Sequence, residues 1–468
     1  MTENFKDFID KIKNKKIMFC GIGRSNLPFI KMLTDEKINV IAYDCKSKEN
    51  ISDDILQNIS ENKYITLRLG DESVWNEDVD IIIRTPGISF FSENIKKARE
   101  KGTIITSEME IFFDLCPCTI IGITGSDGKT TVSTIISEIL KTGGKKVHLG
   151  GNIGKPLLPE IKSIKKEDFA VVELSSFQLL SMRKSPDIAV ITNISPNHLD
   201  IHKNMDEYVF AKRQILIHQN AFSKAVLNFD NSETKKLITD VRGQNIYFSS
   251  KEKLNSGVWI DESNNIIYSS NGKNEKIINT ADIKIPGNHN VENYLAAIAA
   301  TKSLVKTESI KTVAQNFSGV SHRIEFVKNV NGVSYYNDSI ASSPTRVIKG
   351  TLSLFDKKII LIAGGYDKKT PFDKLGEKIL EKVSTLILMG NAAEKIENSV
   401  VNSPNYKTSN LKIIHVKNME EAVKNVHEIA SPGDIVILSP ACASFDLYNN
   451  FEERGNHFKD LVNKLQYK

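Results

Sequence analysis

One segment of the chain combines glycines, a lysine and a hydroxyl at a spacing that suits phosphate binding. It reads Gly125-Ser126-Asp127-Gly128-Lys129-Thr130-Thr131 and lies between the apolar run 119–123 and the helical pattern 132–140. Glycines let backbone N–H groups converge on a phosphate, a lysine adds a positive charge, and a threonine hydroxyl can bind Mg²⁺. The segment therefore predicts a nucleotide-binding P-loop, in a short form because Ile123 stands where the longer pattern needs glycine.

Two polar residues follow strand-like runs and could complete the chemistry of such a loop. The apolar run 170–172 ends in Glu173, and the run 189–193 is followed by His198. A P-loop needs an acid on a neighbouring strand to hold Mg²⁺, and ligands gather at the C-terminal edge of parallel strands. Glu173 and His198 are therefore candidate metal or catalytic residues, with a solvated Glu and a structural His as the alternatives.

A second glycine motif lies near the start of the chain, in Gly21-Ile22-Gly23-Arg24-Ser25-Asn26. Asp44 ends the next predicted strand, so the segment approaches the dinucleotide-binding fingerprint. Asn26 replaces the third glycine, which normally packs the helix on the strand. The motif predicts a Rossmann-like domain that binds some other nucleotide or only packs, with nicotinamide binding as the alternative.

The elements that must position these residues follow an α/β pattern. Short β-branched runs alternate with helical patterns, which favours parallel sheets flanked by helices. Strands are expected at 16–20, 40–44, 81–84, 119–124, 170–173, 189–193, 358–363, 385–389 and 435–439. In residues 224–248 and 257–284, strands follow one another with only turn residues between them. These two segments are expected to be antiparallel, at the edge of a larger sheet.

Length and composition set the class of protein. A chain of 468 residues corresponds to about three domains at about 150 residues each. Junctions are expected near Ser107 and Gly319, giving domains 1–107, 108–319 and 320–468. Hydrophobic residues make up 40% and charged residues 25%, as in soluble globular proteins, which excludes disordered and fibrous classes. The net charge of +5 is spread along the chain and gives no support to nucleic-acid binding.

The cysteines and the hydropathy pattern bear on location. The five cysteines are an odd number, and Cys116-Pro-Cys118 lacks the spacing of a redox or zinc pair. Free thiols in a reducing cytoplasm are the expectation. No stretch approaches the roughly 18 apolar residues of a membrane span. We therefore expect a cytoplasmic protein without a membrane span, acting as a monomer.

Taken together, the motifs resemble those of the Mur ligases, ATP-dependent amide-forming enzymes that build the peptide of bacterial peptidoglycan. The resemblance covers the whole chain and rests on residues 124–131, 150–154, 173–178, 193–200, 287–293, 322–325, 337–339, 438–446 and 450–455. It implies an α/β fold of three domains: a Rossmann-like N-terminal domain that binds a UDP-substrate, a central P-loop ATPase-like domain with a mostly parallel sheet, and a Rossmann-like C-terminal domain that binds an amino acid.

Within the family, the likeness is strongest to the member that adds D-glutamate to UDP-N-acetylmuramoyl-L-alanine through an acyl phosphate. The short first domain and the segments 438–446 and 450–455 carry this likeness. It implies these two small-molecule substrates, with ATP and Mg²⁺ as cofactors. Ile340 and Tyr366-Asp367 depart from the residues that are common in that member.

The resemblance also implies roles for individual residues. For ATP they are Gly125, Ser126, Asp127, Gly128, Lys129, Thr130, Thr131, Asn290, Asn293, Arg323 and Asp338. For the UDP-substrate they are Gly23, Arg24, Ser25, Cys45, Lys46, Asn152 and Ser175. For D-glutamate they are Ser342, Lys368, Ser444, Phe445 and Phe451. Two Mg²⁺ sites are implied, one held by Thr130 and Glu173 and the other by His198 and a carbamylated Lys212. The catalytic residues implied are Lys129, Asn152, Glu173, His198 and Lys212.

Three alternatives remain open at this level. A sister ligase of the family, or a folylpolyglutamate-type ligase, would share the ATP machinery and use another amino acid or acceptor. A nicotinamide-dependent oxidoreductase would use Gly21 to Gly23 for its cofactor. A nucleotide-gated binding module would carry out no catalysis, although such a protein has little need for two metal sites.

Overall fold

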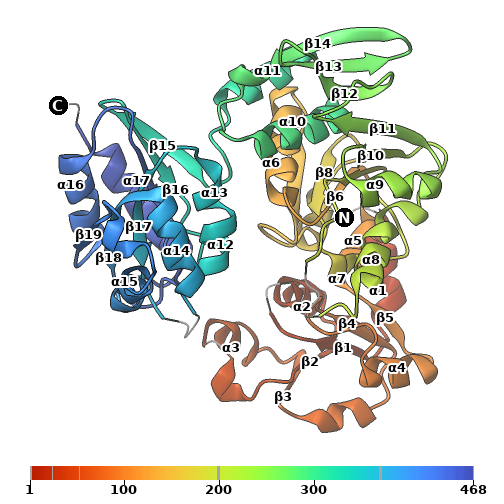
Figure 1. Cartoon of the computed structure of the whole chain (residues 1–468). Helices are drawn as coiled ribbons and strands as arrows, with labels where there is room; N and C mark the ends of the chain where they lie inside the picture. Colours follow the sequence, from red (N-terminus) through yellow and green to blue (C-terminus); the bar gives the residue numbers. More distant parts are fainter. Residues whose placement is uncertain (1–2, 24, 52, 198–200, 368–370, 467–468) are drawn as a thin grey trace. The chain divides into compact units, whose positions relative to one another are not determined.

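The computed structural model describes residues 3–23, 25–51, 53–197, 201–367 and 371–466. The chain divides into two compact units, Met1–Asp282 with His289–Gln315 and Ile283–Asn288 with Asn316–Lys468. Strands in the described residues form three sheets, the first two in the larger unit and the third in the smaller one. Figure 1 shows the first sheet in red and orange, the second in yellow and green, and the third in teal and blue.

The first sheet is parallel and has the strand order β3-β2-β1-β4-β5. Its strands are β1 (Ile17–Cys20), β2 (Val40–Asp44), β3 (Ile65–Leu69), β4 (Ile81–Arg84) and β5 (Ile104–Thr106), with helices α1 (Glu3–Ile12), α2 (Asn26–Asp35), α3 (Asp53–Ile59) and α4 (Glu93–Glu100). Alternate residues of β1 enter different apolar clusters, Ile17 and Phe19 one and Met18 and Cys20 the other. Both faces of the sheet are therefore buried, as expected for a parallel sheet.

The second sheet has the order β14-β13-β12-β11-β10-β9-β6-β8-β7. Its strands are β6 (Thr119–Thr124), β7 (Val147–Gly151), β8 (Phe169–Glu173), β9 (Ile188–Ile191), β10 (Lys224–Asn228), β11 (Gln244–Ser249), β12 (Gly257–Ile260), β13 (Asn265–Ser270) and β14 (Lys273–Asn279). The antiparallel expectation is right for β12, β13 and β14. It is wrong for β10 and β11, which pair in parallel because a short helical crossover connects them.

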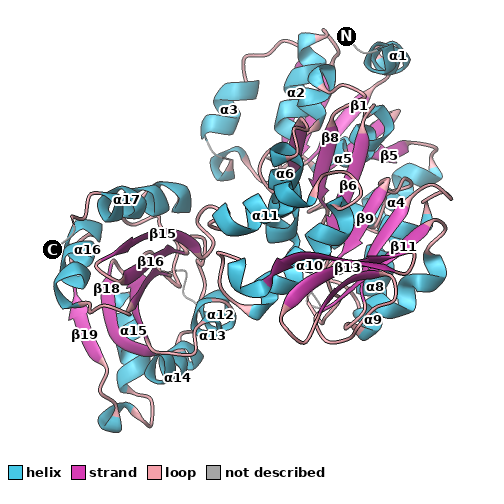
Figure 2. Ribbon diagram, turned by 90° about the horizontal axis from the view of Figure 1, so that it is seen from above, coloured by secondary structure: helices cyan, strands magenta, loops and turns pink. Residues whose placement is uncertain are grey.

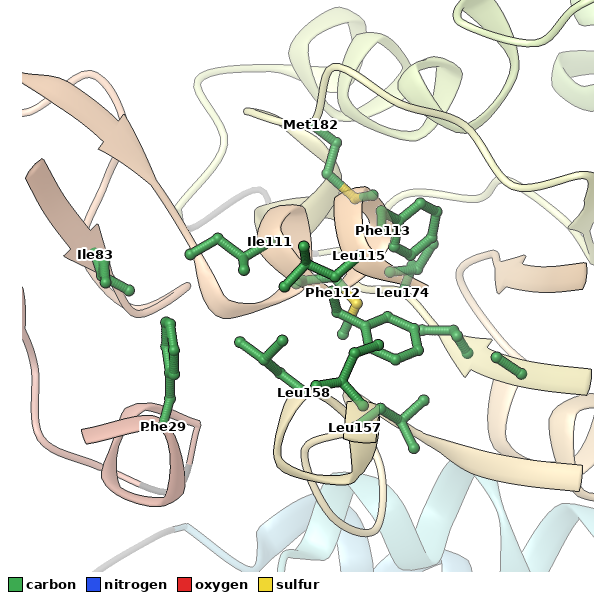
Figure 3. Packing of buried hydrophobic residues seen from close by; sticks show 14 of the residues in the cluster. Phe29, Ile83, Ile111, Phe112, Phe113, Leu115, Leu157, Leu158, Leu174 and Met182 are labelled. Atoms are coloured by element: carbon green, nitrogen blue, oxygen red, sulfur yellow. The ribbon is translucent and has the colours of Figure 1, made fainter. Parts of the chain in front are cut away.

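The helices of this part of the chain are α5 (Glu108–Leu115), α6 (Lys129–Thr142), α7 (Ser176–Leu179), α8 (Met205–Ile217), α9 (Ser232–Lys236), α10 (Asn288–Thr301) and α11 (Thr307–Asn316), and the short helix η3 covers Leu158–Ser163. One apolar cluster joins the first sheet to α5 and η3. Figure 3 shows Phe112 of α5 beside Leu157 and Leu158, with Phe29 of α2 and Ile83 of β4 in the same cluster. The shared core fixes α5, whose first turn will matter for the site.

The third sheet has the order β15-β16-β20-β17-β18-β19, with only the β15–β16 pair antiparallel among the described strands. Its strands are β15 (Glu325–Val330), β16 (Val333–Asn337), β17 (Ile359–Gly364), β18 (Val383–Met389), β19 (Lys412–His415) and β20 (Ile435–Leu438). Its helices are α12 (Pro344–Lys349), α13 (Thr351–Leu354), α14 (Asp373–Lys382), α15 (Ala393–Val401), α16 (Met419–Ile429) and α17 (Phe451–Asn463).

Helices cover both faces of the third sheet. Ile359 and Leu361 of β17 pack with residues of α12 to α15, whereas Ile360 and Ile362 pack with residues of α16 and α17. Figure 2 shows helices on either side of these strands. Among the described residues, no helix is long and apolar enough to cross a membrane.

Candidate active site

The loop between β6 and α6 has a backbone that only glycine fits at two positions. Gly125 has φ 154° and Gly128 has φ 79°, both in the region that L side chains avoid. A Cβ on Gly125 would lie 1.9 Å from Oγ1 of Thr192, and one on Gly128 would lie 2.4 Å from Oδ1 of Asn293. The loop thus leads directly into the N-terminus of α6, where backbone N–H groups and the helix dipole favour an anion.

The loop is held by the segment that follows β9. The N–H of Asp127 donates to Oδ1 of Asn193 at 3.0 Å, and the Thr192 hydroxyl donates to the Asp127 carbonyl at 2.6 Å. Ser126 lies with its hydroxyl 3.0 Å from that of Tyr208 and 2.9 Å from the Ser195 carbonyl. These contacts preorganise the loop, and sequence reasoning missed Thr192 and Tyr208 because neither belongs to a recognisable phosphate motif.

Lys129 lies over its own loop. Its ammonium donates to the carbonyls of Gly125 and Ser126, each at 3.0 Å. Thr131 follows in the first turn of α6. The positive charge is therefore held at the position where a phosphate bound by the loop would lie.

Glu173 joins three elements beside this loop. It ends β8 and is 2% exposed. Its Oε2 accepts a hydrogen bond from the Thr130 hydroxyl at 2.7 Å, and its Oε1 accepts one from the Asn152 amide at 2.8 Å. The arrangement offers carboxylate and hydroxyl oxygens next to a phosphate site, which is the ligand chemistry that Mg²⁺ prefers.

Lys212 is buried under the same loop. It lies on α8, is 1% exposed, and its amine donates to the Gly125 carbonyl at 2.7 Å and to the Thr124 hydroxyl at 3.3 Å. Its Nζ is 4.7 Å from the centre of the Tyr208 ring. Burial and, after it, the nearby Lys129 charge hold the pKa of Lys212 well below its ordinary value. This lysine is therefore more readily neutral than a surface lysine.

A pocket of about 470 Å³ lies close to these residues in the larger unit, and we name it the large pocket. The predicted residues Gly23, Ser25, Cys45, Lys46 and Asn152 line it. Asn152 thus belongs both to the wall of the pocket and to the hydrogen bonds of Glu173. The remaining residues that line it are Gly21, Asp44, Thr85, Pro86, Gly87, Ile88, Glu108, Gly151, Gly154, Pro156 and Gln178.

The glycine loop that follows β1 shows how Asn26 can replace the third glycine of the dinucleotide-binding fingerprint. Gly21 has φ 85°, and a Cβ there would lie 2.6 Å from Oγ1 of Thr85. The buried Asn26 amide donates to the carbonyls of Gly21 at 2.9 Å and Ile83 at 3.2 Å. Asn26 therefore ties α2 to β1 and β4 by hydrogen bonds, in place of the close packing that a third glycine allows.

Ser175 does not line the large pocket, but it hydrogen-bonds Gln178, which does. Its hydroxyl caps α7 by accepting from the N–H of Gln178 and also donates to the Gln178 side chain at 3.0 Å. Gln178 itself lines the large pocket. The sequence interpretation assigned the contact to Ser175 and missed Gln178, although both lie in the same predicted motif.

The predicted ATP residues of α10 lie in the larger unit. The Asn293 amide donates to Oδ1 of Asn290 at 3.1 Å, and Asn293 is the side chain that abuts Gly128. Arg24, His198 and Lys368 lie outside the described residues. Among the residues described, no cluster of three or more His, Cys, Asp or Glu side chains could hold a metal.

In the smaller unit, Asp338 is buried and hydrogen-bonded on both carboxylate oxygens. It accepts from the hydroxyls of Thr351 at 2.6 Å and Ser439 at 2.9 Å and from the N–H of Ile324 at 3.3 Å. Burial raises the pKa of Asp338 to about 6. Arg323 directly precedes Ile324 in the chain and forms an isolated antiparallel β-bridge with Val320.

Two of the predicted amino-acid-binding residues, Ser444 and Phe451, lie close to contacts of a buried arginine. Arg454 donates to the carbonyl of Ala443, which precedes Ser444, at 3.0 Å and to the carbonyl of Ser339 at 2.9 Å, and the Ser339 hydroxyl donates to the Phe451 carbonyl at 2.8 Å. Ser444 is buried, and Phe445 is 63% exposed with its ring against that of Tyr366. Ser342, half-buried, precedes α12. Sequence reasoning missed Arg454 because an arginine in a surface-like charged helix is ordinarily solvated.

Comparison with known proteins agrees with this geometry. Residues 123–301 match the Mur ligase middle domain, and residues 322–442 match the Mur ligase glutamate ligase domain. The chain is 48% identical over 469 residues to a UDP-N-acetylmuramoylalanine–D-glutamate ligase of Acetivibrio thermocellus, covering 100% of both chains. It is 47% identical to the protein of the same name from Clostridium kluyveri, covering 99% of this chain and 100% of the relative.

A solved structure supports the fold. The UDP-N-acetylmuramate–alanine ligase of Thermotoga maritima superposes with a TM-score of 0.57 at 19% identity, covering 96% of this chain and 99% of that one. At this identity the likeness concerns the fold alone. The two domain matches and the full-length relatives lead to one conclusion: the chain belongs to the Mur ligase family.

Proposed function

We propose that the protein is an ATP-dependent ligase that adds D-glutamate to UDP-N-acetylmuramoyl-L-alanine in peptidoglycan precursor synthesis, forming ADP and phosphate. One observation supports the reaction type: Asn152 both lines the large pocket and hydrogen-bonds Glu173 beside the P-loop. An acid substrate in that pocket would meet the triphosphate there. The names of the full-length relatives support the choice of D-glutamate and of the UDP-linked acid.

The chemistry needs ATP because a carboxylate is a poor electrophile. Transfer of the γ-phosphoryl group to the L-alanine carboxylate forms an acyl phosphate and releases ADP. The amine of D-glutamate then attacks the carbonyl carbon, loses a proton, and the C–O bond to phosphate breaks. Every species is anionic, so Lys129 and the backbone N–H groups of the P-loop contribute most by stabilising charge on the transferring group.

Residues of the P-loop region fit Mg²⁺ as the metal. Glu173 and Thr130 supply hard oxygen ligands, and a site of this kind uses one or two carboxylates together with substrate phosphates. When bound, Mg²⁺ neutralises phosphate charge and orients the γ-phosphoryl group. Asn152 keeps the Glu173 carboxylate turned toward Thr130 and faces the acid substrate.

A second Mg²⁺ site is proposed at His198 and a carbamylated Lys212. A neutral amine is the form that adds to CO₂, releasing a proton and leaving a negatively charged carbamate. The lowered pKa of the buried Lys212 supports this reaction. An unmodified ammonium would repel a cation, so the modification is required if Lys212 is to be a ligand.

The remaining assignments complete the proposal. The UDP part is taken by residues 21–25 and 44–46, ATP by the P-loop with Asn290, Asn293, Arg323 and Asp338, and D-glutamate by Ser342, Lys368, Ser444, Phe445 and Phe451. The domains are 1–107, 108–319 and 320–468, of which the first and third are Rossmann-like and the second carries the P-loop. The enzyme works as a monomer in the cytoplasm, where ATP is available.

The specificity is tested by supplying amino acids singly. ADP release is measured with UDP-N-acetylmuramoyl-L-alanine and either D-glutamate, L-glutamate, glycine, L-lysine or diaminopimelate. D-glutamate alone is expected to support turnover. Equal use of L-glutamate, or exclusive use of another amino acid, would replace the proposal with a sister ligase.

A further inference from the structure

The large pocket contains a buried carboxyl group that the proposed reaction does not use. Glu108 is the first residue of α5 and is 4% exposed. Its Oε1 accepts a hydrogen bond from the N–H of Leu158 at 3.0 Å, and the residue lines the large pocket. Its position is fixed, because α5 and η3 pack together in the shared apolar core.

Glu108 lines the large pocket together with residues of both parts of the candidate site, namely Gly23 and Ser25 of the glycine loop and Asn152 beside the P-loop. It shares a small recess with Ser25 of the glycine loop and with Gln178 of α7. Under the proposed function, the diphosphate lies at the glycine loop and the L-alanine carboxylate lies at Asn152. The part of the ligand that joins these two ends is the N-acetylated amino sugar, so this is the group that passes Glu108.

The surroundings of Glu108 disfavour a negative charge. The other ionisable groups of the large pocket and the recess are Asp44, Cys45, Lys46 and Arg84. Among the described residues, no cation forms an ion pair with Glu108, and Arg84 donates instead to the Ile88 carbonyl and the Ser181 hydroxyl. Burial raises the pKa of Glu108 to about 7, although the hydrogen bond from Leu158 opposes the shift.

Among the described residues, the charged groups on the elements packed against Glu108 have other partners. On α5, Glu110 accepts from the hydroxyls of Ser107 and Ser181. On η3, Glu160 faces His148 and Lys155, and Lys162 pairs with Glu36. A bound ligand with a negatively charged diphosphate would oppose ionisation of Glu108 further.

We propose that Glu108 binds the amino sugar of the substrate as a neutral carboxyl group, donating a hydrogen bond to a sugar oxygen while its other oxygen accepts from Leu158. This inference rests on the proposed function. It makes Glu108 a specificity-determining residue, because a neutral donor recognises the sugar without repelling the diphosphate beside it.

The test is calorimetric binding to the full chain, with three nucleotides at pH 6.0, where Glu108 is mostly protonated. UDP lacks the sugar, UDP-N-acetylglucosamine has the sugar without the lactyl arm, and UDP-N-acetylmuramoyl-L-alanine has both. Glu108→Ala is expected to weaken both sugar nucleotides about tenfold and to leave UDP binding unchanged. Glu108→Gln, which keeps a neutral donor, is expected to bind all three within about threefold of the unaltered protein.

The dependence on pH follows from the same proposal. The protonated form binds, so the affinity of the unaltered protein for UDP-N-acetylglucosamine is constant below about pH 6 and falls as the pH rises through the pKa of Glu108, which is about 7 in the free pocket. Both phosphates of this ligand are diesters and do not titrate there. Glu108→Gln is expected to remove the part of the pH dependence that lies between pH 6.5 and 8.5.

Glu110→Gln is the matched control, since it makes the same change on the same helix at a half-buried residue that does not line the large pocket. It is expected to leave the ratio of sugar-nucleotide to UDP affinity unchanged. Glu108→Ala with unchanged affinities, or with equal losses for UDP and the sugar nucleotides, would overturn the proposal. Losses in Glu108→Gln as large as in Glu108→Ala would show an anionic acceptor and would also overturn it.

Two further results separate this inference from the proposed function. A loss confined to UDP-N-acetylmuramoyl-L-alanine would assign Glu108 to the lactyl-alanine arm and overturn the sugar assignment. An unaltered protein that binds none of the three nucleotides would overturn the proposed function itself. Normal turnover of the unaltered protein with unchanged binding by Glu108→Ala would overturn only the inference.

Discussion

Strand β8 carries a buried carboxylate at each end, and only one of them should matter for catalysis. Glu173 ends the strand next to the P-loop, and Asp168 immediately precedes it at the opposite edge of the sheet. Ligands of parallel sheets gather at the C-terminal strand ends. We predict that Glu173→Gln abolishes most turnover with little loss of stability, and that Asp168→Asn does the reverse.

The size of each effect follows from the contacts. In Glu173→Gln, the new carbonyl oxygen still accepts from the Asn152 amide, and the new amide donates to the Thr130 hydroxyl, which can rotate to accept. The variant can therefore still form two side-chain hydrogen bonds at this position, so the free energy of unfolding should change by less than about 1 kcal/mol. Loss of the charge that we propose as a Mg²⁺ ligand should lower kcat/KM by about 10²–10³-fold.

The control keeps an acceptor oxygen but loses the negative charge that its contacts stabilise. Asp168 accepts from His148 at 2.9 Å and from the N–H of Lys165 at 3.0 Å, with Lys146 nearby. Burial opposes ionisation of Asp168, but these contacts outweigh it and leave its pKa lowered. Asp168→Asn should therefore destabilise the protein by about 1–3 kcal/mol and leave kcat/KM unchanged.

The assay measures phosphate release against Mg²⁺ concentration, alongside thermal unfolding of both variants. Glu173→Gln is expected to need more Mg²⁺ for its residual turnover and to unfold within about 4 °C of the unaltered protein. Full turnover of Glu173→Gln at an unchanged Mg²⁺ requirement would refute the metal assignment. An equal loss of turnover in Asp168→Asn would show that both carboxylates act through stability.

Three further variants test other parts of the site. Lys129→Ala should lower turnover by about 10³-fold or more while leaving calorimetric binding of the UDP-substrate intact, and unchanged turnover would refute the position of the ATP site. Lys212→Ala should be inactive in phosphate release and partly rescued by added short carboxylates, which can replace the carbamate oxygens; rescue by amines instead would indicate a cationic role. Arg84→Met removes the donor to the carbonyl of Ile88 and the hydroxyl of Ser181, so the pocket wall loosens and the KM of the UDP-substrate should rise about tenfold. An equal rise in the KM of ATP would contradict that local role.

The strands that sequence reasoning found are those whose burial shows as a continuous apolar run. Residues 40–44, 81–84 and 119–124 are strands with the predicted bounds, because each is apolar on both faces. The run 65–69 was missed since polar Thr66 and Arg68 interrupt it at a sheet edge. The pairing of β10 with β11 was misjudged because the short crossover at 232–240 reads as a turn.

Local sequence patterns identify candidate site residues whose conformation is set locally, and they do not reveal burial that the fold sets. The P-loop glycines, Thr130 and Glu173 are recognisable, because turn conformation and strand ends are local properties. The burial of Lys212 and Glu108 depends on α8 and α5 packing against distant segments, which no local pattern encodes. The altered pKa values of Lys212 and Glu108 follow from that burial, so the sequence alone does not predict them.

Under the proposed function, the protein couples ATP hydrolysis to amide formation between two defined substrates. The direct measurement is phosphate release from ATP and Mg²⁺ with UDP-N-acetylmuramoyl-L-alanine and D-glutamate, each omitted in turn. Release that requires both substrates, with one phosphate for each amide formed, is the predicted result. Release that is independent of the UDP-substrate, or that proceeds at the full rate without any amino acid, would contradict the account.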